Sequence, residues 1–405
     1  MTLTEGPASG GRAPRTGTEA DAVGGLIPAH VARPTDTGAL GRTLAEAAGR
    51  GLAVLARGGG TALDWGGVPR RLDLLVDTGD LSWIEHIAGD LVVEVGAGTP
   101  VAELYEVLDA AGQRLSADPV RVGGTVGGMV ATGVSGPRRL LSGSLRDLII
   151  GMTVVRADGV VARSGGRVVK NVAGYDLAKL HTGGWGTLGV IASVAFRLHP
   201  TPPALRLVNR AVSSVEEAEN ASASLRRGSM VPSAVELEWS ARGRGRVRVV
   251  LEGTPDGLRA RVDATTSALG GATEVVASLP PGWGLLPMEG TLALVSVPPA
   301  ESARAAARVV ELACDADVRV NASLLTGALH VSFPPRSETD LIASVAGGVR
   351  SVPDWSMTLL RAEPHLHAAG VDLWGEVPGL PLMRAVKDAF DPEHRMAPGR
   401  FAGGI

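Results

Sequence analysis

The sequence predicts an α+β fold, and three features of the chain lead to this prediction. Apolar runs of strand length alternate with helical patterns along the first 200 residues. That half also holds 36 of the 55 glycines, so it needs many positions without a Cβ, for turns or for close approach to a ligand. A proline cluster (Pro200, Pro202 and Pro203) then separates it from a second region with a looser strand and helix pattern. With 405 residues, the chain is long enough for two or three domains.

The first region begins with a segment that has no periodicity. Residues 1–24 are small and polar and lack the apolar run of a secretory signal, so we expect a disordered leader in a cytoplasmic protein. A helix is predicted from Thr37 to Gly49 or Gly51, where glycine ends the apolar pattern. Strands are predicted at the apolar runs 52–56, 72–76 and 91–95.

Local stop and start signals define the elements that follow. Thr99 is the expected cap of a helix with Pro100 at its first position, and Gly112 ends that helix. Residues 145–163 predict two strands joined by a turn at Asp158-Gly159. A further strand is expected over 190–198.

The second region also mixes helices and strands, with far less glycine. Amphipathic helices are predicted at 212–227 and 301–313, and strands at 246–251, 291–297 and 328–333. A last helix is expected from Pro381 through Phe390, and the extended segment DPEHRMAPGRF follows it. No internal repeat is evident in the sequence.

The composition excludes several classes of protein. A net charge of −3 argues against binding to nucleic-acid phosphates, which requires a basic face. No stretch approaches the roughly 18 apolar residues of a membrane span. The one cysteine, Cys314, excludes an internal disulfide, a zinc site built from cysteines alone and an iron–sulfur cluster ligated by this chain alone.

Three glycine-rich stretches in the first region indicate a phosphate-bearing ligand. They are residues 56–67, 121–136 and 181–190, and each adjoins a predicted strand. Successive glycines let main-chain N–H groups converge on an anion, so a diphosphate bound in this way requires no lysine or arginine. One such stretch is more often a plain turn, but three are harder to explain in that way.

The familiar nucleotide motifs do not account for these stretches. Residues 184–189 match G-x-G-x-x-G, but a helical pattern precedes them and a strand follows, which is the reverse of a Rossmann site. The phosphate loop of nucleotide hydrolases is absent, as are the motifs H-E-x-x-H and G-x-S-x-G. The spacing therefore favours a non-Rossmann, non-hydrolysing binder of a large phosphate-bearing ligand.

Three motifs in a fixed order resemble the FAD-binding domain of the vanillyl-alcohol-oxidase flavoprotein superfamily. They are RGGGT (57–61), GGTVGGMVATGVSGPRRLLSGSLRDLIIGMTVV (123–155) and GGRVVKNVAGYDLAKLHTGGWGTLGVI (165–191). The stretches SGPRR, SLRD and KNVAGYDLAKL, together with the terminal FDPEHRMAPGRF, are most similar to the FAD-binding, E-type subunits of glycolate dehydrogenases (glycolate oxidases). The resemblance is strong over 27–200 and clear at 386–401.

This resemblance implies a PCMH-type fold. A FAD-binding domain of two α+β subdomains over 25–200, with the diphosphate between them, would precede an antiparallel-sheet cap over 201–380. Residues 381–405 would return to the FAD-binding domain. The implied cofactor-binding residues are Arg57, Gly58, Gly59, Gly60 and Thr61 in the first stretch, Gly123, Gly124, Thr125, Gly127, Gly128, Ser135 and Gly136 in the second, and Gly186, Gly189, Val190 and Ile191 in the third. Thr61 stands where covalent members of the superfamily often carry a histidine, so non-covalent FAD is implied.

The resemblance also implies a reaction and partners. Flavoproteins of this class oxidise a 2-hydroxy acid to a 2-oxo acid, and the protein orients the substrate carbon against the flavin. A second flavoprotein subunit and an iron–sulfur subunit are the implied partners. The metal motif H-A-G-D-G-N-L-H of the catalytic sister subunits is missing, so no metal site is expected. Two alternatives stay open: a stand-alone FAD oxidase or dehydrogenase that uses O₂ or a quinone, and a structural subunit whose flavin never meets substrate.

The roles of several single residues stay open, and no catalytic base is identified. Arg138 or Arg139 could clamp a substrate carboxylate or compensate the charge of reduced flavin, or they could be a surface pair or a partner contact. His181 could transfer a proton or be structural, and Tyr175 could hydrogen-bond near the flavin or pack. His365 and His367 could alternate on a strand and bind a metal, but they are more simply polar residues near a turn after Pro364. The alternating Arg242, Arg244, Arg246 and Arg248 predict one solvated strand face, and Cys314 is expected to be a small core residue.

Overall fold

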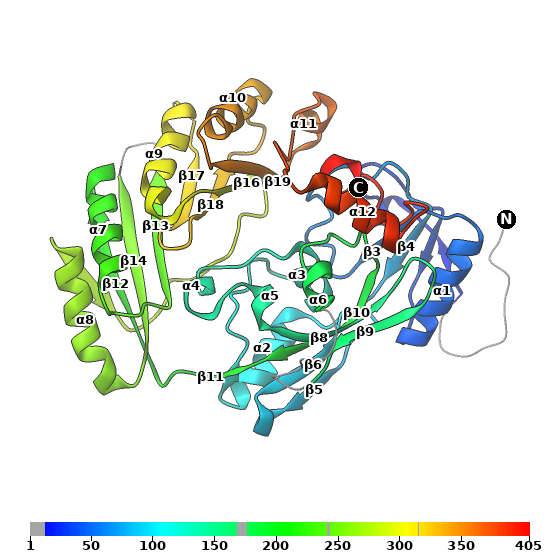
Figure 1. The fold of residues 1–405 in the computed structure, drawn as a ribbon, viewed down its shortest axis with the longest axis horizontal. Coiled ribbons are helices and arrows are strands. Elements are labelled where there is room, and N and C mark those ends of the chain that lie inside the picture. Colours follow the sequence, from blue (N-terminus) through cyan, green and yellow to red (C-terminus); the bar gives the residue numbers. More distant parts are fainter. Residues whose placement is uncertain (1–12, 168–175, 241–243, 315) are drawn as a thin grey trace.

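The computed structural model describes residues 13–167, 176–240, 244–314 and 316–405 (Figure 1). These residues form an N-terminal lobe with two sheets and a cap with one large sheet. The mixed α+β class predicted from the sequence is confirmed. Tyr175 and Arg242 lie outside the described residues.

The first sheet of the N-terminal lobe is mostly parallel. Its strands in spatial order are β1 (Arg15–Thr16), β2 (His30–Ala32), β4 (Leu74–Asp77) and β3 (Val54–Arg57), and only β1 runs antiparallel. Helix α1 (Thr37–Gly49) buries Leu40 and Leu44 in the core that it shares with β3 and β4. The Asp36 carboxylate accepts a hydrogen bond from Ala39 N at 2.7 Å, which caps this helix where the sequence predicted its start.

The second sheet is antiparallel throughout. In spatial order it contains β5 (Ile84–Ile87), β6 (Val92–Gly96), β10 (Val190–Arg197), β8 (Ile149–Val155) and β9 (Val161–Gly165). Among the described residues, five helices lie in the segments that connect its strands, namely α2 (Val101–Ala110), α3 (Val126–Thr132), α4 (Arg139–Ser142), α5 (Leu145–Leu148) and α6 (Ala178–His181). The predicted hairpin turn at Asp158-Gly159 is confirmed, and Gly159 takes a φ of 85°, which favours glycine.

Three local predictions in this lobe are wrong. Thr99 does not cap α2, because its hydroxyl is already paired with the backbone N and O of Trp83, and the helix begins after Pro100. Residues 145–148 form the helical turn α5 rather than a strand, since Asp147 accepts hydrogen bonds from Ser144 N and Oγ and so starts a helix. Residues 13–24, expected within a disordered leader, contain β1, which pairs with β2.

Asp21 is the reason that this N-terminal segment is ordered. Its side chain is only 3% exposed and accepts hydrogen bonds from Arg15 at 2.7 Å and from Arg57 at 3.0 Å. The hydrogen bond from Arg15 is the largest cause that holds the pKa of Asp21 far below its usual range. A carboxylate that is buried and paired in this way holds the segment against the end of β3.

The cap is built from two topological repeats, although no repeat is evident in its sequence. Each repeat has the order strand, helix, strand, strand, helix, strand of a ferredoxin-like unit. The first comprises β12 (Ala204–Val212), α7 (Val215–Arg227), β13 (Ala234–Ser240), β14 (Gly245–Gly253), α8 (Pro255–Leu269) and β15 (Thr273–Val276). The second comprises β16 (Thr291–Ser296), α9 (Ser302–Leu312), β17 (Arg319–Ser323), β18 (Ala328–Phe333), α10 (Thr339–Arg350) and β19 (Ser356–Arg361). The helices and strands predicted in this region are therefore confirmed.

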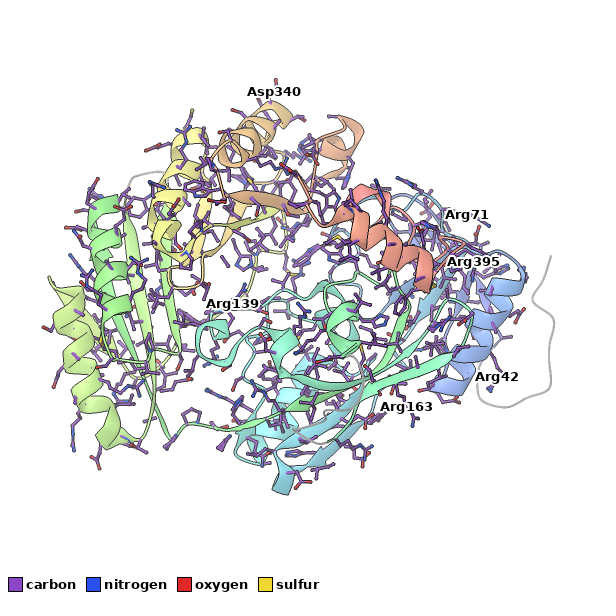
Figure 2. The ribbon with its side chains drawn as sticks, viewed as in Figure 1. Arg42, Arg71, Arg139, Arg163, Asp340 and Arg395 are labelled. Atoms are coloured by element: carbon purple, nitrogen blue, oxygen red, sulfur yellow. The ribbon has the colours of Figure 1, made fainter. Side chains whose placement is uncertain are left out.

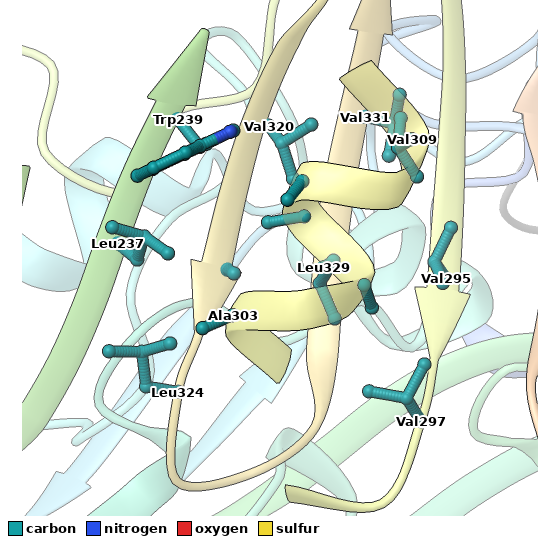
Figure 3. Close-up of a cluster of buried hydrophobic side chains, with 14 of the residues drawn as sticks. Leu237, Trp239, Val295, Val297, Ala303, Val309, Val320, Leu324, Leu329 and Val331 are labelled. Atoms are coloured by element: carbon teal, nitrogen blue, oxygen red, sulfur yellow. The ribbon is translucent and has the colours of Figure 1, made fainter. Parts of the chain in front are cut away.

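The two repeats join into one eight-stranded antiparallel sheet. The spatial order is β15-β12-β14-β13-β17-β18-β16-β19, so β13 of the first repeat pairs with β17 of the second. The helices cover one face of this sheet, and the other face turns toward the N-terminal lobe (Figure 1). On the helix side, alternate strand residues such as Leu237, Val320 and Leu329 pack against α9 in an aliphatic core (Figure 3).

One prediction about a single residue in the cap region is wrong, and the strand considered for two histidines is not formed. Cys314 is exposed rather than buried, because it follows the end of α9 with a φ of 52° that turns the chain away from the core. His365 and His367 lie on the short helix α11 (Pro364–Ala368) rather than on a strand, since Pro364 starts a helix there. His365 Nε2 is hydrogen-bonded to Ser337 O at 3.0 Å.

The end of the chain lies against the N-terminal lobe. After α12 (Leu380–Phe390), residues 395–397 run beside β3: Val54 N donates to Arg395 O at 2.8 Å, and Ala397 N donates to Val54 O at 2.7 Å. Lys387, which is fully buried on α12, donates to the Asp391 carboxylate at 2.7 Å. It also donates to Thr187 O at 2.7 Å and to Met396 O at 2.9 Å.

A group of buried charges joins the cap to the N-terminal lobe. Arg114, on β7 (Gln113–Arg114), donates to both carboxylate oxygens of Glu252 on β14, at 2.7 and 2.8 Å. Arg138 bridges Glu252 and Asp118, so one carboxylate of the cap is held by two guanidinium groups of the other lobe. The strand β7 itself pairs with β11 (His199–Pro200) at the link between the lobes. None of the described helices is both long and apolar enough to cross a bilayer.

Replacing Glu252 with glutamine should destabilise the chain by about 3 kcal/mol near neutral pH, because it leaves buried guanidinium groups with one partner fewer. Burial alone raises the pKa of Glu252, but the hydrogen bond from Arg114 and the charges of Arg138 and Arg114 outweigh it and lower the pKa to about 2. Because the folded pKa is the lower one, this stabilisation is present above about pH 4.5 and is lost as the pH falls toward 2.

Urea unfolding of the wild type and of Glu252→Gln across this pH range measures the effect. The exposed Glu311→Gln on α9 is the control and should follow the wild type. Equal unfolding free energies for Glu252→Gln and the wild type at pH 7 would show that the ion pairs of Glu252 do not stabilise the chain.

Replacing Lys387 with methionine should lower the free energy of unfolding by about 3–5 kcal/mol, because it leaves the Asp391 carboxylate buried without its cation. The free energy of unfolding is the measurement, and Arg384→Met on the exposed part of the same helix is the matched control. If both variants lost the same small amount, the buried pair would not hold the C-terminal segment.

Candidate functional site

The first glycine-rich stretch follows β3 and is held in place by arginines. Arg57 ends the strand, and its guanidinium pairs with Asp21 at 3.0 Å and Asp77 at 2.9 Å, so this side chain is occupied by two carboxylates. Beyond it, Arg121 Nε donates to Thr61 O at 3.0 Å. Arg400 from the C-terminal segment donates to Leu63 O, Gly67 O and Ala62 O at 2.9–3.3 Å. The carbonyl groups of residues 61–67 therefore point at guanidinium groups, which fixes the conformation of the stretch.

The first and second stretches pack closely against each other at two glycines of the first stretch. A Cβ on Gly58 would lie 2.0 Å from Thr125 Oγ1, and a Cβ on Gly59 would lie 2.2 Å from Gly123 O. Neither position can carry a side chain unless the two stretches move apart. These glycines are therefore required for packing between the two sheets of the lobe.

A cleft lies beside this contact. One part, of about 550 Å³ including space open to solvent, is lined mainly by residues 55–63 together with Thr125, Thr132 and Arg400. The other part, of about 430 Å³ on the same measure, is lined by Thr78, Ala97 and residues of the third stretch. Both parts share the lining residues Ala56, Gly58, Gly128, Ala131 and Trp185, so they form one continuous cleft between the two sheets.

Two other glycines open directly onto this cleft. A Cβ on Gly128, in α3, would meet nothing closer than Thr125 Oγ1 at 3.5 Å, and a Cβ on Gly186 would meet nothing within 4 Å. Both residues line the cleft. A side chain at Gly128 would be tolerated by the protein but would project into the space where a ligand can approach the main chain, whereas Gly186 has a φ of 74° that also favours glycine.

The third stretch combines strained backbone with a large aromatic side chain. Gly183 and Gly186 have φ values of 75° and 74°, and Trp185 takes a φ of 54°, which is rare for a residue with a side chain. The Trp185 indole lies edge-on to Trp374 at 5.7 Å and at 6.5 Å from Phe401. Because Trp185 lines both parts of the cleft, these contacts from the C-terminal region set the position of one wall.

Three guanidinium groups make the first stretch electropositive. Arg121, Arg361 and Arg400 surround it, and Asp64 is the carboxylate that faces all three. Burial lowers the pKa of Arg400 to about 10, so the side chain stays charged at neutral pH although it is only 6% exposed. Glu289 and Glu363 also face Arg361. It is therefore the positive charge of Arg121 and Arg400, which both face Asp64, that favours an anionic ligand in this part of the cleft. The sequence analysis did not single out Arg121, Arg361 or Arg400.

The structure gathers most of the predicted binding residues at the cleft. Those that line it are Arg57, Gly58, Gly59, Gly60, Thr61, Thr125, Gly127, Gly128, Gly186, Gly189, Val190 and Ile191. Gly123 and Gly124 lie behind the lining, where Gly124 O accepts from Val101 N. Ser135 Oγ accepts from Leu145 N at 3.0 Å and is buried away from the cleft, and Gly136 lines a different pocket.

The open roles of two further residues become clearer. Arg138 is neither a free clamp nor a surface residue, because Asp118 and Glu252 occupy its guanidinium. His181 is 7% exposed and lies edge-on to Phe390 at 5.8 Å, and burial lowers its pKa to about 4. A neutral, packed imidazole fits a structural role better than proton transfer.

Comparison with protein families identifies the N-terminal lobe. Residues 28–165 match the model of an FAD binding domain, which is about a third of the chain. This match contains the first and second glycine-rich stretches and ends before the third. FAD is accordingly the cofactor that the domain indicates.

Several characterised proteins are similar to part of the chain. Glycolate oxidase subunit GlcE of Escherichia coli is 42% identical over 31% of this chain and 37% of its own length. D-lactate dehydrogenase of Archaeoglobus fulgidus is 32% identical over 51% of this chain and 46% of its own length. Glycolate oxidase subunit GlcD of Bacillus subtilis is 28% identical over 52% of this chain and 45% of its own length. The chain thus spans between a third and a half of the length of these relatives.

Solved structures extend the similarity to the cap. An alkyldihydroxyacetonephosphate synthase superposes with a TM-score of 0.69 over 92% of this chain and 76% of that protein, at 14% sequence identity. At this identity the comparison shows the fold alone. The PCMH-type fold predicted from the sequence is confirmed, and residues 28–165 of this fold match an FAD binding domain.

Proposed function

We propose that the cleft holds FAD non-covalently, with the diphosphate against the first and second glycine-rich stretches. The support is the set of residues on the page: main-chain groups at Gly128 and Gly186 open onto the cleft, and Arg400 adds a positive charge beside it. The guanidinium of Arg57 does not take part in this proposal, since Asp21 and Asp77 occupy it. Thr61 at the cleft offers no nucleophilic ring nitrogen for a covalent bond to the flavin, unlike a histidine.

The reaction proposed is the oxidation of a 2-hydroxy acid to a 2-oxo acid, with glycolate as the first candidate substrate. FAD, when bound, supplies the electron acceptor for the hydride that leaves C2 of the acid. The chain's own contribution is to fix the cofactor between two sheets and to exclude water from it. This proposal rests on the matched FAD-binding domain and on relatives named as glycolate oxidase subunits and a D-lactate dehydrogenase.

Partners form part of the same proposal. Electrons must leave the flavin, and a chain with one cysteine cannot by itself provide the four ligands of an iron–sulfur cluster. We therefore propose an iron–sulfur subunit and a second flavoprotein subunit as partners, in the cytoplasm. Two relatives are named as subunits, which supports a complex.

The continuous cleft between the two sheets is the observation that carries the proposed function. It distinguishes a flavin carrier from a protein that merely keeps the fold, because the glycines at Gly128 and Gly186 keep space that the packing of the protein does not use. A stand-alone oxidase and a structural subunit with an idle flavin are the alternatives, and the second test below separates them.

Gly128→Val should lower the affinity for FAD at least tenfold (~1.4 kcal/mol), because its Cβ meets no protein atom closer than 3.5 Å and its side chain would project into the cleft. Flavin absorbance per chain after purification and FAD titration of the apoprotein are the measurements. Gly347→Val is the matched control, since Gly347 is also helical, lies exposed on α10 and has nothing within 4 Å of its Cβ position. Wild-type flavin content in Gly128→Val would refute the placement of FAD.

Anaerobic mixing with 2-hydroxy acids tests the reaction. The yellow chain should be bleached at its flavin absorbance band by glycolate or lactate, and the flavin-poor Gly128→Val should show no such signal. Bleaching of the chain alone, followed by fast re-oxidation with O₂, would favour the stand-alone oxidase. Bleaching only in the presence of a second flavoprotein and an iron–sulfur protein would favour the complex. A flavin that no acid reduces under either condition would leave only the structural subunit.

A further inference from the structure

A second pocket lies on the inner face of the cap sheet, where the two topological repeats meet. We call it the seam pocket. It is bounded by the strands β13, β14, β17 and β18, by Gly136-Pro137 of the N-terminal lobe and by the loop 280–286. Its open space is about 860 Å³ including solvent, and among the described residues it shares no lining residue with the FAD cleft.

The inner face of the sheet is apolar on both sides of this pocket and polar at the pocket itself. On one side the face is apolar, with Leu207, Ala234 and Val250 packed together, and on the other side Leu292 and Leu360 belong to an apolar cluster. Between them the strands present polar residues at the same alternate positions, namely Glu236, Glu238, Arg248, Asn321, Ser323 and His330. A sheet face that only packs against another lobe would continue the apolar pattern, so the polar seam needs another explanation.

The pseudo-symmetry of the cap places these residues in matching positions. Glu236 pairs with Arg248 across β13 and β14, and Asn321 pairs with His330 across β17 and β18. The strands β13 and β17 themselves pair with Glu236 opposite Ser323. The two repeats therefore contribute unlike polar pairs to one pocket, which gives it a different chemistry on its two sides.

Two buried nitrogen atoms at the pocket lack partners among the described residues. They are His330 Nε2, on the sheet, and Trp283 Nε1, on the loop opposite. A buried donor without a partner costs stability, and such atoms are rare in folded proteins. Because both residues line one pocket, a ligand bound in it could pair with both orphaned atoms.

The charges around the pocket favour an anion. Burial raises the pKa of Glu236 to about 8, with Asp118 adding to the rise and Ser323 and Arg139 opposing it, so at neutral pH its carboxyl group is mostly protonated and can donate. Burial and the charge of Arg139 lower the pKa of His330 to about 4, which leaves a neutral imidazole.

Two arginines complete this electrostatic arrangement. Arg248 pairs with Glu238 at 2.9 Å, so these two charges balance. Arg139, on α4 between the two lobes, makes no side-chain hydrogen bond or ion pair with any described residue (Figure 2). Neutral donors thus surround a site near one uncompensated positive charge.

We propose that the seam pocket binds a small carboxylic acid that also carries a hydroxyl group. The carboxylate would accept hydrogen bonds from Trp283 Nε1 and from the protonated carboxyl group of Glu236. The hydroxyl group would pair with His330 and Asn321, which can each donate and accept. The choice of hydroxy acids rests on the proposed function, but binding itself needs no oxidation.

A hydroxy acid without hydrogen on C2 separates binding from oxidation. The probe is 2-hydroxy-2-methylpropanoate, titrated calorimetrically into the flavin-containing full chain. It should bind saturably, whereas 2-methylpropanoate, which lacks the hydroxyl group, and 2-methyl-1,2-propanediol, which lacks the carboxylate, should bind at least tenfold more weakly. No saturable binding of the probe below about 10 mM would overturn the proposal.

Variants test whether the probe occupies this pocket. Trp283→Phe keeps the ring and removes the N–H group, so it should weaken binding about fivefold to tenfold. Trp83→Phe, at a 41% exposed residue of the other lobe, is the matched control and should bind as the wild type does. Unchanged binding in Trp283→Phe and in His330→Leu would place the probe elsewhere and overturn the proposal.

Substitutions at Glu236 test the neutral carboxyl group. Glu236→Gln keeps a neutral donor of the same size, so its affinity for the probe should stay within twofold of the wild-type affinity. Glu236→Leu should bind the probe at least tenfold more weakly than the wild type. Wild-type affinity should fall as the pH rises through 8, and that of Glu236→Gln should not. Wild-type binding by Glu236→Leu, with its native circular dichroism and flavin absorbance retained, would overturn this role.

These outcomes are independent of the proposed oxidation. A chain that binds the probe but is never bleached by glycolate keeps the seam pocket and loses the oxidation. A chain that is bleached by glycolate, with rates unaffected by Trp283→Phe and Glu236→Leu and with no binding of the probe, loses the seam pocket and keeps the oxidation.

Discussion

The cleft of the N-terminal lobe depends on one contact between two glycine-rich stretches, in which Gly59 meets the main chain of Gly123 and Gly58 meets the side chain of Thr125. Gly58 and Gly59 approach Thr125 and Gly123 so closely that any Cβ would overlap with their atoms. The first stretch follows β3 of the mostly parallel sheet, and the second contains α3, whose Val126 and Val130 pack in the core of the antiparallel sheet, so this contact also links the two sheets. The same residues therefore pack the lobe together and border the proposed cofactor site.

Much of the fold could be predicted because its signals are local. A cap residue, a proline at a first turn or an Asp-Gly turn acts within four residues, and α1, the hairpin at Gly159 and α12 lie where such signals placed them. Two of the failures have a common cause, which is a partner far away in the sequence. Thr99 has the side chain of a helix cap, but Trp83, 16 residues earlier in the chain, already uses its hydroxyl group. In the same way, residues 13–24 read as a polar leader until Asp21 is seen to meet Arg57, 36 residues away.

The candidate site shows the same limit in sharper form. The sequence motifs predicted the same role, cofactor binding, for all of these glycines, but the structure shows two roles. Gly59 allows the first and second glycine-rich stretches to touch, whereas Gly128 and Gly186 leave space open in the cleft. The side chains that hold the stretches in place come from the far end of the chain, since Lys387 reaches Thr187 across 200 residues and Arg400 reaches Leu63 across 337. A lone lysine or arginine carries no local signal of its distant partner, so no pattern in the sequence could have indicated these roles.

The two halves of the cap have the same topology but different side chains on the inner face of the sheet. Its two halves repeat one topology, although their sequences show no repeat, because a ferredoxin-like unit requires only apolar residues at alternate strand positions on the helix side. The opposite face is under no such constraint where it borders a pocket, and there the halves differ: Glu236 and Arg248 in one correspond to Asn321 and His330 in the other. Symmetry in the backbone with asymmetry in the side chains is what a site for an unsymmetrical ligand needs. A carboxylate at one end and a hydroxyl group at the other would each meet a different half of the seam.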